Sequence, residues 1–413
     1  MNDSLQHESA PLLRHNHNTP AAESAAVTRR SFLRGAGALV IGGTVLTACS
    51  SASSAAADPT ATLVPSMAVS TKAPPTAIPT PTPAAVAAPA ATPTPQPARP
   101  VTADRVAADP TNIPGPVDWK EPKRHKIELE TVEVIAEIEP GVTFSYMTFG
   151  GQVPGPMIRV RQGDTVEFTL ISRESDIMPH NIDFHSVYGP GGGAEATDVS
   201  PGQSNGMIFQ ARYPGAFLYH CAVPILDYHI SSGMYGMIVV EPPDGLTPVD
   251  HEFYVGQNEV YTDLPVGTKG HHNFGFAAMR QENATYVLLN GEKYALTPDR
   301  RGAMKVKVGE TARIFFVCGG PNLACNFHPI GNVWSKAWRE GALMSAPELF
   351  VQTMSVPPGS CGVFEMEFPV PGQVKLVDHA ITRVVSKGML GIIEVEGPEQ
   401  PDIFNPTLPG EPT

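Results

Sequence analysis

Short runs of alternating or continuous apolar residues, broken by Gly and Pro, fill the chain from about residue 123 to residue 400. A period of two residues places successive side chains on opposite faces of a strand, and runs of this length between turn residues are typical of β-strands. The pattern therefore predicts an all-β protein built from β-sandwiches. Representative runs are KIELETVEVIAEI (126–138), DTVEFTLI (164–171), GMIVVEP (236–242), ARIFFVC (312–318), QVKLVDHA (373–380) and GIIEVEG (391–397).

The two halves of this region repeat one another. VRQGDTVEFTLI (160–171) returns as VKVGETARIFFV (306–317), and YPGAFLYHC (213–221) returns as VPGQVKLVDH (370–379). Each half then ends in a similar turn and strand, GMYGMIVVE or GMLGIIEVE. Two copies of one sandwich, joined near Pro242 to Val249, explain the repeat. We predict one domain over 123–243, a second over 244–400 and a tail over 401–413.

The first 49 residues have the features of a targeting signal. Paired arginines in TRRSFLR (28–34) precede the apolar run GAGALVIGGTVLTA (35–48), which is too short to span a bilayer. The segment resembles a twin-arginine export signal. Its end, LTAC, resembles a bacterial lipobox, which predicts a lipid on Cys49; the alternative is a simple export signal with an incidental cysteine.

Fifteen prolines among Ala, Thr and Ser mark the segment from residue 50 to residue 116. Such a composition cannot bury a core and favours extended polyproline conformations. We therefore predict a disordered stalk over 50–122, which holds the folded part of an exported, lipid-anchored protein at the outer face of the cell membrane or in the periplasm. The net charge of −13 argues against nucleic acid as a partner and leaves the lipid as the means of membrane attachment.

The motif HNIDFH (180–185) places two histidines and an aspartate in one predicted strand. Alternation directs His180 to one face of that strand and both Asp183 and His185 to the other. The strand is therefore expected to serve two sites.

The first site draws on the segment YHCAVPILDYHISSGM (219–234). It supplies a soft thiolate, an imidazole and a thioether at Cys221, His229 and Met234. With His180 they make the His₂Cys set with a weak axial Met that is typical of a blue-copper electron-transfer site. We predict that these four residues hold a type 1 copper.

The second site lies on the opposite face. His220 precedes Cys221 and should point away from the first site, as His185 points away from His180. A third imidazole is expected from His379, at the position of the second sandwich that repeats the YHC segment. Three neutral imidazoles with one open position suit a catalytic metal that binds a small molecule. Asp183 shares this face and can act there as an acid.

From about residue 123 to residue 400 the chain resembles the copper-containing nitrite reductases, and most closely their surface-anchored subgroup with short loops. The resemblance rests on PHNIDFH, YHC…HISSGMYG, GGPNL…FHPIG and VDHAI…KGMLG…VEG. It implies two cupredoxin domains of Greek-key topology, a homotrimer and two copper ions per chain. Type 1 copper lies inside the first domain, and type 2 copper lies between one chain's His185 and His220 and a neighbour's His379. The implied reaction is the dissimilatory reduction of nitrite to nitric oxide and water, with a cupredoxin or a c-type cytochrome as electron donor.

The resemblance also implies roles for a loop of the second half. His328 matches a second acid–base residue of the family, and Ile330 matches its apolar group over the type 2 copper. Pro329 stands where the family usually has an aliphatic residue. Because proline fixes φ and removes an N–H, its effect on this loop and on the rate is left open.

Three further cysteines and four further histidines have no assigned role. A disulfide is compatible with export, but three cysteines leave at least one free or paired between chains. The histidines are expected to be surface residues, although GHHNFG (270–275) could chelate a stray metal. The cysteines are Cys318, Cys325 and Cys361, and the histidines are His125, His251, His271 and His272.

Two other functions compete with nitrite reduction. A multicopper oxidase of the laccase type needs eight imidazoles in His-x-His and HCH motifs, but Ala222 follows Cys221 and the only His-x-His, at 15–17, lies in the signal segment. A pure electron carrier would leave the second site vacant, and one copper per chain in place of two would reveal it.

Overall fold

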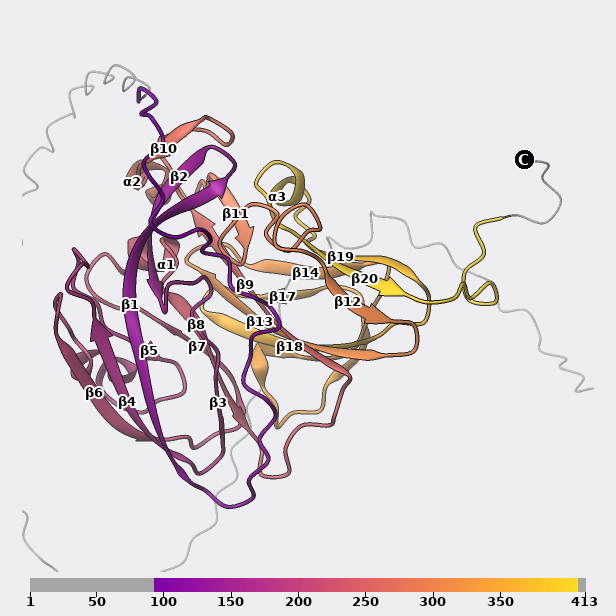
Figure 1. Cartoon of the computed structure of the whole chain (residues 1–413). Coiled ribbons are helices and arrows are strands. Elements are labelled where there is room, and N and C mark those ends of the chain that lie inside the picture. Colours follow the sequence, from indigo (N-terminus) through magenta and orange to yellow (C-terminus); the bar gives the residue numbers. More distant parts are fainter. Residues whose placement is uncertain (1–92, 408–413) are drawn as a thin grey trace, which may run out of the picture. The chain divides into compact units, whose positions relative to one another are not determined.

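The computed structural model describes residues 93–407, and these form four β-sheets with a few short helices (Figure 1). The predicted all-β architecture is confirmed. The predicted signal with Cys49, the stalk up to residue 92 and residues 408–413 of the tail lie outside the described residues. None of the helices in 93–407 is long and apolar enough to cross a membrane.

Two sheets form the first domain. One has the order β10-β2-β1-β4-β6 and the other the order β3-β8-β7-β5. A short 3₁₀ segment, η1 (Pro190–Ala196), and helix α1 (Leu226–Ser231) lie in its loops. The strands are β1 (Arg124–Glu139), β2 (Val142–Phe149), β3 (Ile158–Arg161), β4 (Thr165–Ser172), β5 (Asp183–Phe184), β6 (Ser204–Gln210), β7 (Gly215–His220), β8 (Tyr235–Glu241) and β10 (Gly270–His272).

The second domain has sheets of order β11-β9-β13-β18-β15-β16 and β12-β20-β19-β14-β17. Its helical segments are α2 (Phe276–Arg280), η2 (Arg339–Gly341) and α3 (Thr382–Val385). The strands are β9 (His251–Val260), β11 (Tyr286–Leu289), β12 (Met304–Lys307), β13 (Thr311–Gly320), β14 (Cys325–Ile330), β15 (Trp334–Trp338), β16 (Glu348–Val351), β17 (Met354–Val356), β18 (Ser360–Glu367), β19 (Gly372–Asp378) and β20 (Leu390–Glu396).

The strand order reproduces the repeat seen in the sequence. The order β3-β8-β7-β5 of the first domain is matched by β12-β20-β19-β14 of the second. β3 runs parallel to β8, as β12 runs parallel to β20. In the other pair of sheets β1 is parallel to β4, as β9 is parallel to β13. Both halves of the chain therefore build the same sandwich.

Three clusters of buried side chains hold the domains together. One fills the first sandwich and a second fills the other. The third combines residues of both, such as Leu218 and Tyr235 from the first domain with Phe315 and Val363 from the second. Since burial of apolar surface is worth about 25 cal/mol per Å², this shared core fixes the two sandwiches to each other.

The last part of the predicted stalk is not a free linker. From residue 93 to residue 122 the chain is a strap that packs on both domains. Val106, Ala107 and Ala108 are buried, and Ala107 forms a bridge with Val153. The prediction from composition failed here because a few small apolar residues among the prolines fit grooves that other parts of the chain create.

Glu292 anchors this strap. Its buried carboxylate accepts hydrogen bonds from the backbone N–H groups of Val106 and Ala107, at 3.1 and 3.0 Å. It also pairs with Arg105 at 2.6 Å. One side chain therefore satisfies two backbone donors and a guanidinium of the strap.

Glu292→Ala should lower the free energy of unfolding by about 3 kcal/mol, because it leaves a charge and two donors without partners. Urea denaturation followed by fluorescence measures the change. Glu396→Ala is the control, since its side chain is 64% exposed and pairs only loosely with Lys305; it should change stability by less than about 0.5 kcal/mol. A loss below about 1 kcal/mol for Glu292→Ala would mean that other contacts hold the strap.

The expectation that His271 and His272 are surface residues is wrong. Both are buried, because β10 adds to the sheet of the first domain beside β2, although it follows β9 in the chain (Figure 1). His271 Nδ1 lies 3.1 Å from Thr143 Oγ1, and His272 Nε2 lies 2.8 Å from the carbonyl of Thr268. Both rings are structural.

His125 and His251 remain at the surface, although neither is fully exposed. Each pairs through Nε2 with a carboxylate at 2.7 Å, from Asp164 for His125 and from Glu310 for His251. Neither belongs to a cluster of potential metal ligands among residues 93–407.

Candidate metal centres

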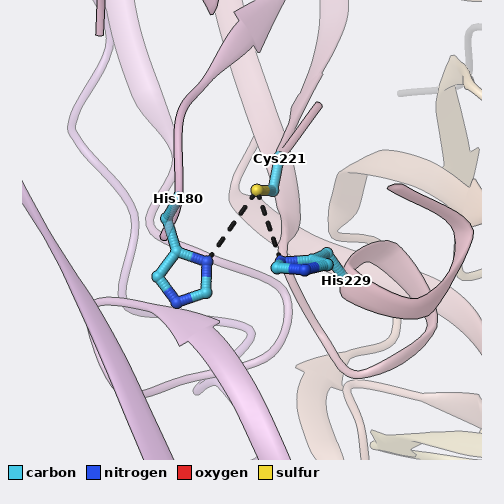
Figure 2. A group of neighbouring side chains, drawn as sticks. All are labelled: His180, Cys221 and His229. Carbon is cyan, nitrogen blue, oxygen red and sulfur yellow. Dashed lines mark hydrogen bonds between the residues drawn. The ribbon is translucent and has the colours of Figure 1, made fainter. Parts of the chain in front are cut away.

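A cluster of one thiol and two imidazoles lies inside the first domain. Cys221 Sγ is 3.9 Å from His180 Nδ1 and 3.6 Å from His229 Nδ1 (Figure 2). All three side chains are completely buried. Cys221 follows the end of β7, His229 lies on α1, and His180 comes from a segment that bridges to Val199. Segments distant in sequence thus direct two ring nitrogens at one sulfur.

The backbone ties Met234 to this cluster. The N–H of Cys221 donates to the carbonyl of Met234 at 3.2 Å, and the N–H of Met234 donates to the carbonyl of His229 at 3.1 Å. The Met234 side chain is fully buried in the same core as Cys221. Asn181 adds a further constraint, because its Oδ1 accepts the N–H of Ala222 at 2.7 Å and so holds the Cys221 loop against the segment of His180.

The electrostatics of the cluster favour a thiolate. Burial opposes ionisation of Cys221, but hydrogen bonds with His180 and His229 outweigh it and lower the pKa of the thiol to about 6. A pKa this low provides the deprotonated sulfur that a metal needs as a ligand. Burial would lower the pKa of His180, but its contacts with Cys221 and Glu133 raise that pKa to about 9.

A second cluster lies behind the first, on the other side of β5 and β7. His185 Nε2 and His220 Nε2 are 3.2 Å apart, and Asp183 Oδ2 is 3.7 Å from His220 Nε2. His220 Nδ1 lies 2.9 Å from the carbonyl of Cys221, so Nδ1 carries the proton and Nε2 is free to bind a metal. Burial and the neighbouring His220 ring lower the pKa of His185, which keeps this imidazole neutral.

A glycine makes room for Asp183, and nothing in the sequence pattern singled it out. Gly192 in η1 has φ +57°, and a Cβ there would come within 1.9 Å of Asp183 Oδ1. The glycine-rich loop therefore lies directly over the carboxylate, and only a residue without a side chain permits this approach.

HNIDFH was predicted to be one strand with alternating faces. The structure keeps the alternation of faces, although the strand itself is interrupted. HNIDFH is not one regular strand, because β5 covers only Asp183–Phe184 and His180 pairs separately with Val199. The backbone is extended enough to keep the alternation, so that His180 faces Cys221 while Asp183 and His185 face His220. The structure thus forms two separate clusters of potential metal ligands from this segment, and their use as metal sites stays a prediction.

The second domain carries its own pair of imidazoles. The His328 and His379 rings have centroids 5.1 Å apart, close to the 5.2 Å between His185 and His220. His379 is exposed. In the part of the chain that the structure describes, His379 does not join the cluster of Asp183, His185 and His220.

The repeat places the two pairs at the same end of each sandwich, but not at equivalent positions. Asp183 lies opposite His220 between β5 and β7, whereas His328 lies opposite Val377 between β14 and β19, and His379 directly follows β19. The segments GMYGMIVVE and GMLGIIEVE align β8 with β20, and the registers then match His220 with Val377 and Asp183 with His328. The ligands of the first cluster do not return, because Asp378 occupies the position that corresponds to Cys221.

His379 is held by a buried carboxylate that the sequence did not reveal as important. Asp378 is fully buried and accepts the N–H groups of Asn326 and Ala380 at 3.1 and 2.9 Å. It also pairs with Arg383 at 2.5 Å. The N–H of His379 in turn donates to the carbonyl of Asn326 at 2.8 Å. This network fixes the end of β19 against the start of β14.

His328 is oriented through its Nδ1, which lies 2.6 Å from the carbonyl of Gln352 and 3.2 Å from Thr353 Oγ1. The carbonyl can only accept, so Nδ1 carries a proton and Nε2 is the nitrogen that can gain or lose one. Ile330, at the end of the same strand, is 41% exposed, as a group at the rim of an open site should be.

The structure shows how β14 accommodates Pro329 in its backbone hydrogen bonding. The carbonyl of Asn326 faces β19, so alternation directs the missing N–H of Pro329 to the other edge of β14. On that edge the pairing with β17 ends at Phe327. Proline at this position therefore removes no hydrogen bond of the ladder.

The three remaining cysteines do not form a disulfide within the described residues. Cys318, Cys325 and Cys361 are all free and buried in the second domain. Burial raises the pKa of Cys325 and Cys361 well above the usual value, so both are protonated thiols that behave as small apolar side chains.

Two sandwiches with the same strand order define the chain as a two-domain cupredoxin. A family model described as multicopper oxidase matches residues 131–245, most of the first sandwich. The chain is 42% identical over 305 residues to the copper-containing nitrite reductase of Neisseria meningitidis serogroup B, covering 74% of this chain and 77% of that protein. The copper-containing nitrite reductase of Cereibacter sphaeroides is 34% identical, covering 68% and 79%.

Among solved structures, copper nitrite reductase from Nitrosomonas europaea matches with a TM-score of 0.60 and 30% identity, covering 68% of this chain and 96% of that one. The chain belongs to the copper-containing nitrite reductases. It is a copper-containing oxidoreductase, as the resemblance of its sequence implied.

Proposed function

We propose that this chain reduces nitrite to nitric oxide and water with one electron and two protons at a pair of copper sites. The observation that carries the proposal is the adjacency of His220 and Cys221. These neighbouring residues belong to two clusters on opposite faces, so a single peptide unit connects a site suited to electron transfer with a site suited to small-molecule binding.

The first cluster fits a type 1 copper. Two Nδ1 atoms and a thiol of lowered pKa converge in the buried core, and Met234 is buried in the same core. The ligands in this assignment are His180, Cys221, His229 and Met234.

The second cluster fits two of the three ligands of a type 2 copper. His185 and His220 offer imidazoles whose Nε2 atoms converge. We assign the third position to His379 of a second copy of the chain, because this residue is exposed and stands apart from the cluster in its own chain. Repetition of that contact closes a ring, and we propose that the ring is a trimer.

Bound copper supplies one-electron redox chemistry at both clusters and a Lewis acid for nitrite at the second. The protein supplies the protons. Asp183 lies beside His220 and can hydrogen-bond bound nitrite and deliver a proton. His328 can deliver the other from Nε2, since Nδ1 is engaged by Gln352. Ile330 gives this position an apolar wall.

We propose further that the protein is exported and attached by a lipid on Cys49, and that a cupredoxin or a c-type cytochrome donates the electron. The chain's paired arginines and lipobox-like LTAC support this proposal. Labelling of the expressed full-length chain with a radioactive fatty acid, with Cys49→Ala as control, tests the anchor.

Anaerobic reduction of nitrite by the copper-loaded protein, with nitric oxide detected at an electrode, tests the function. Two copper ions per chain are expected. A stoichiometry of one, with no turnover, would identify a pure electron carrier. Consumption of oxygen without production of nitric oxide would favour an oxidase of the kind named by the family model.

Asp183→Asn and His328→Ala should each keep both copper ions and lose most of the turnover. Neither the amide nor the methyl group can relay a proton at neutral pH, and general acid–base catalysis typically contributes about 10²–10⁴-fold. Steady-state kinetics and copper analysis check both statements. Glu348→Gln, an exposed side chain paired with Arg339, serves as the control. Turnover within about threefold of the wild type would remove the substituted residue from the mechanism.

A further inference from the structure

We infer that Glu133 is a positioning residue for the first copper site: its carboxylate holds the far nitrogen of His180 and sets the reduction potential of a metal bound there. The inference rests on the proposed function, in which His180 is a copper ligand. It assigns a role to a residue on β1, a strand that carries none of the proposed ligands.

His180 needs a hydrogen-bond acceptor at its far nitrogen, Nε2. Nδ1 faces Cys221, so a metal at that nitrogen leaves the proton of the neutral imidazole on Nε2. Nε2 is completely buried and has no hydrogen bond of good geometry among the described residues. A buried donor without a partner is unfavourable by about 1–3 kcal/mol in general, so this N–H needs an acceptor.

Glu133 supplies that acceptor. Its Oε1 lies 3.4 Å from His180 Nε2, which a small rotation of either side chain brings to hydrogen-bond distance. A carboxylate behind a histidine ligand fixes the tautomer and the orientation of the ring and makes the ring a stronger donor to the metal.

The carboxylate itself is firmly held. The same oxygen accepts the N–H groups of Ile177 and Met178, both at 2.8 Å. The N–H of Glu133 donates to Asp176 Oδ1 at 3.1 Å. Glu133 therefore connects β1 to the segment that leads into His180, and its position is set before any metal binds.

Solvent screens the Glu133 carboxylate only weakly. The Glu133 side chain is only 15% exposed, and it lines a cavity of about 360 Å³ together with Met147, Met178 and Tyr228. Two backbone N–H groups donate to the Glu133 carboxylate, and hydrogen bonds of this kind favour its charged form. The Nε2 atom of His229, the other imidazole, is also buried but pairs with no carboxylate among residues 93–407, so the two ligands differ.

A negative charge close to the metal stabilises Cu(II) over Cu(I). Glu133→Gln keeps an acceptor of the same shape and removes the charge. We therefore expect the Cu(II)/Cu(I) equilibrium of this variant to shift about tenfold toward Cu(I). For one electron this shift raises the reduction potential by about 59 mV. Glu133→Asp keeps the charge, so its Cu(II)/Cu(I) equilibrium constant should stay within about twofold of the wild-type value.

The experiment is a redox titration of the copper-loaded full-length proteins, followed through the visible colour, which does not depend on turnover. Glu128→Gln is the matched control, because it removes the same charge from an exposed position of the same strand. It should leave the potential unchanged. If the wild type binds no coloured copper, the proposed function fails before any variant is compared.

Four outcomes decide the inference. An upward shift in Glu133→Gln alone supports it, as does loss of copper from Glu133→Gln with retention in Glu133→Asp. If Glu133→Gln changes the Cu(II)/Cu(I) equilibrium constant by less than about twofold, the inference is wrong. Loss of copper from both variants also overturns it, because Glu133 then serves only to hold residues 177 and 178.

Discussion

Replacement of Cys221 with alanine is expected to abolish the visible colour of the copper-loaded protein and to reduce nitrite turnover to background. The colour of a blue-copper site arises from charge transfer between a thiolate and Cu(II), and Cys221 is the thiol at which the two Nδ1 atoms converge. The electron would also lose its route, because the path to the second site runs through the peptide between Cys221 and His220. Absorption spectroscopy and nitric oxide detection measure the two effects.

The second copper should survive this substitution. His220 is held through Nδ1 by the backbone carbonyl of Cys221, which alanine also provides. Electron paramagnetic resonance should therefore show the type 2 signal alone. Cys318→Ala is the control, since Cys318 is an equally buried thiol in the second domain, and it should keep both colour and turnover. Colour that persists in Cys221→Ala would show that another residue supplies the thiolate.

Much of this arrangement follows from local rules of the sequence. Alternation along a strand does not need tertiary information, so the opposite orientations of His180 and His185 could be predicted although the strand between them is interrupted. The repeat located the right end of the second sandwich, but the strand registers match YHC at 219–221 with LVD at 376–378, so that His379 lies one residue further along.

What the sequence could not reveal are contacts between distant segments. Glu133 on β1 and Asp378 on β19 look like ordinary acidic positions, and their roles depend on what the fold brings beside them. The prediction of a disordered stalk failed at the strap for the same reason. Its composition is that of a disordered chain, and its backbone partners, such as Glu292 and Val153, lie far along the sequence. The burial of His271 likewise depends on a sheet to which a later segment returns.

The second large effect is expected from a mixture of two inactive proteins. His185→Ala and His379→Ala should each lack the type 2 copper and turn over nitrite at background, while both keep the colour of the first site. In the proposed ring each type 2 site combines His185 and His220 of one chain with His379 of the next. A mixed ring then contains some interfaces whose three histidines are all intact, and exchange of subunits should restore activity to a fraction of the wild-type level.

The geometry supports this expectation over a site within one chain. The two histidine pairs belong to different sandwiches, and the shared apolar core between the domains prevents them from folding onto each other. Subunit exchange can be followed with chains of different mass, and the activity is read after exchange is complete. A mixture of two His379→Ala preparations is the control, because no arrangement of these chains yields a complete site. If exchange occurs and the mixed rings stay inactive, all three histidines must come from a single chain, and the proposed interface between copies is wrong.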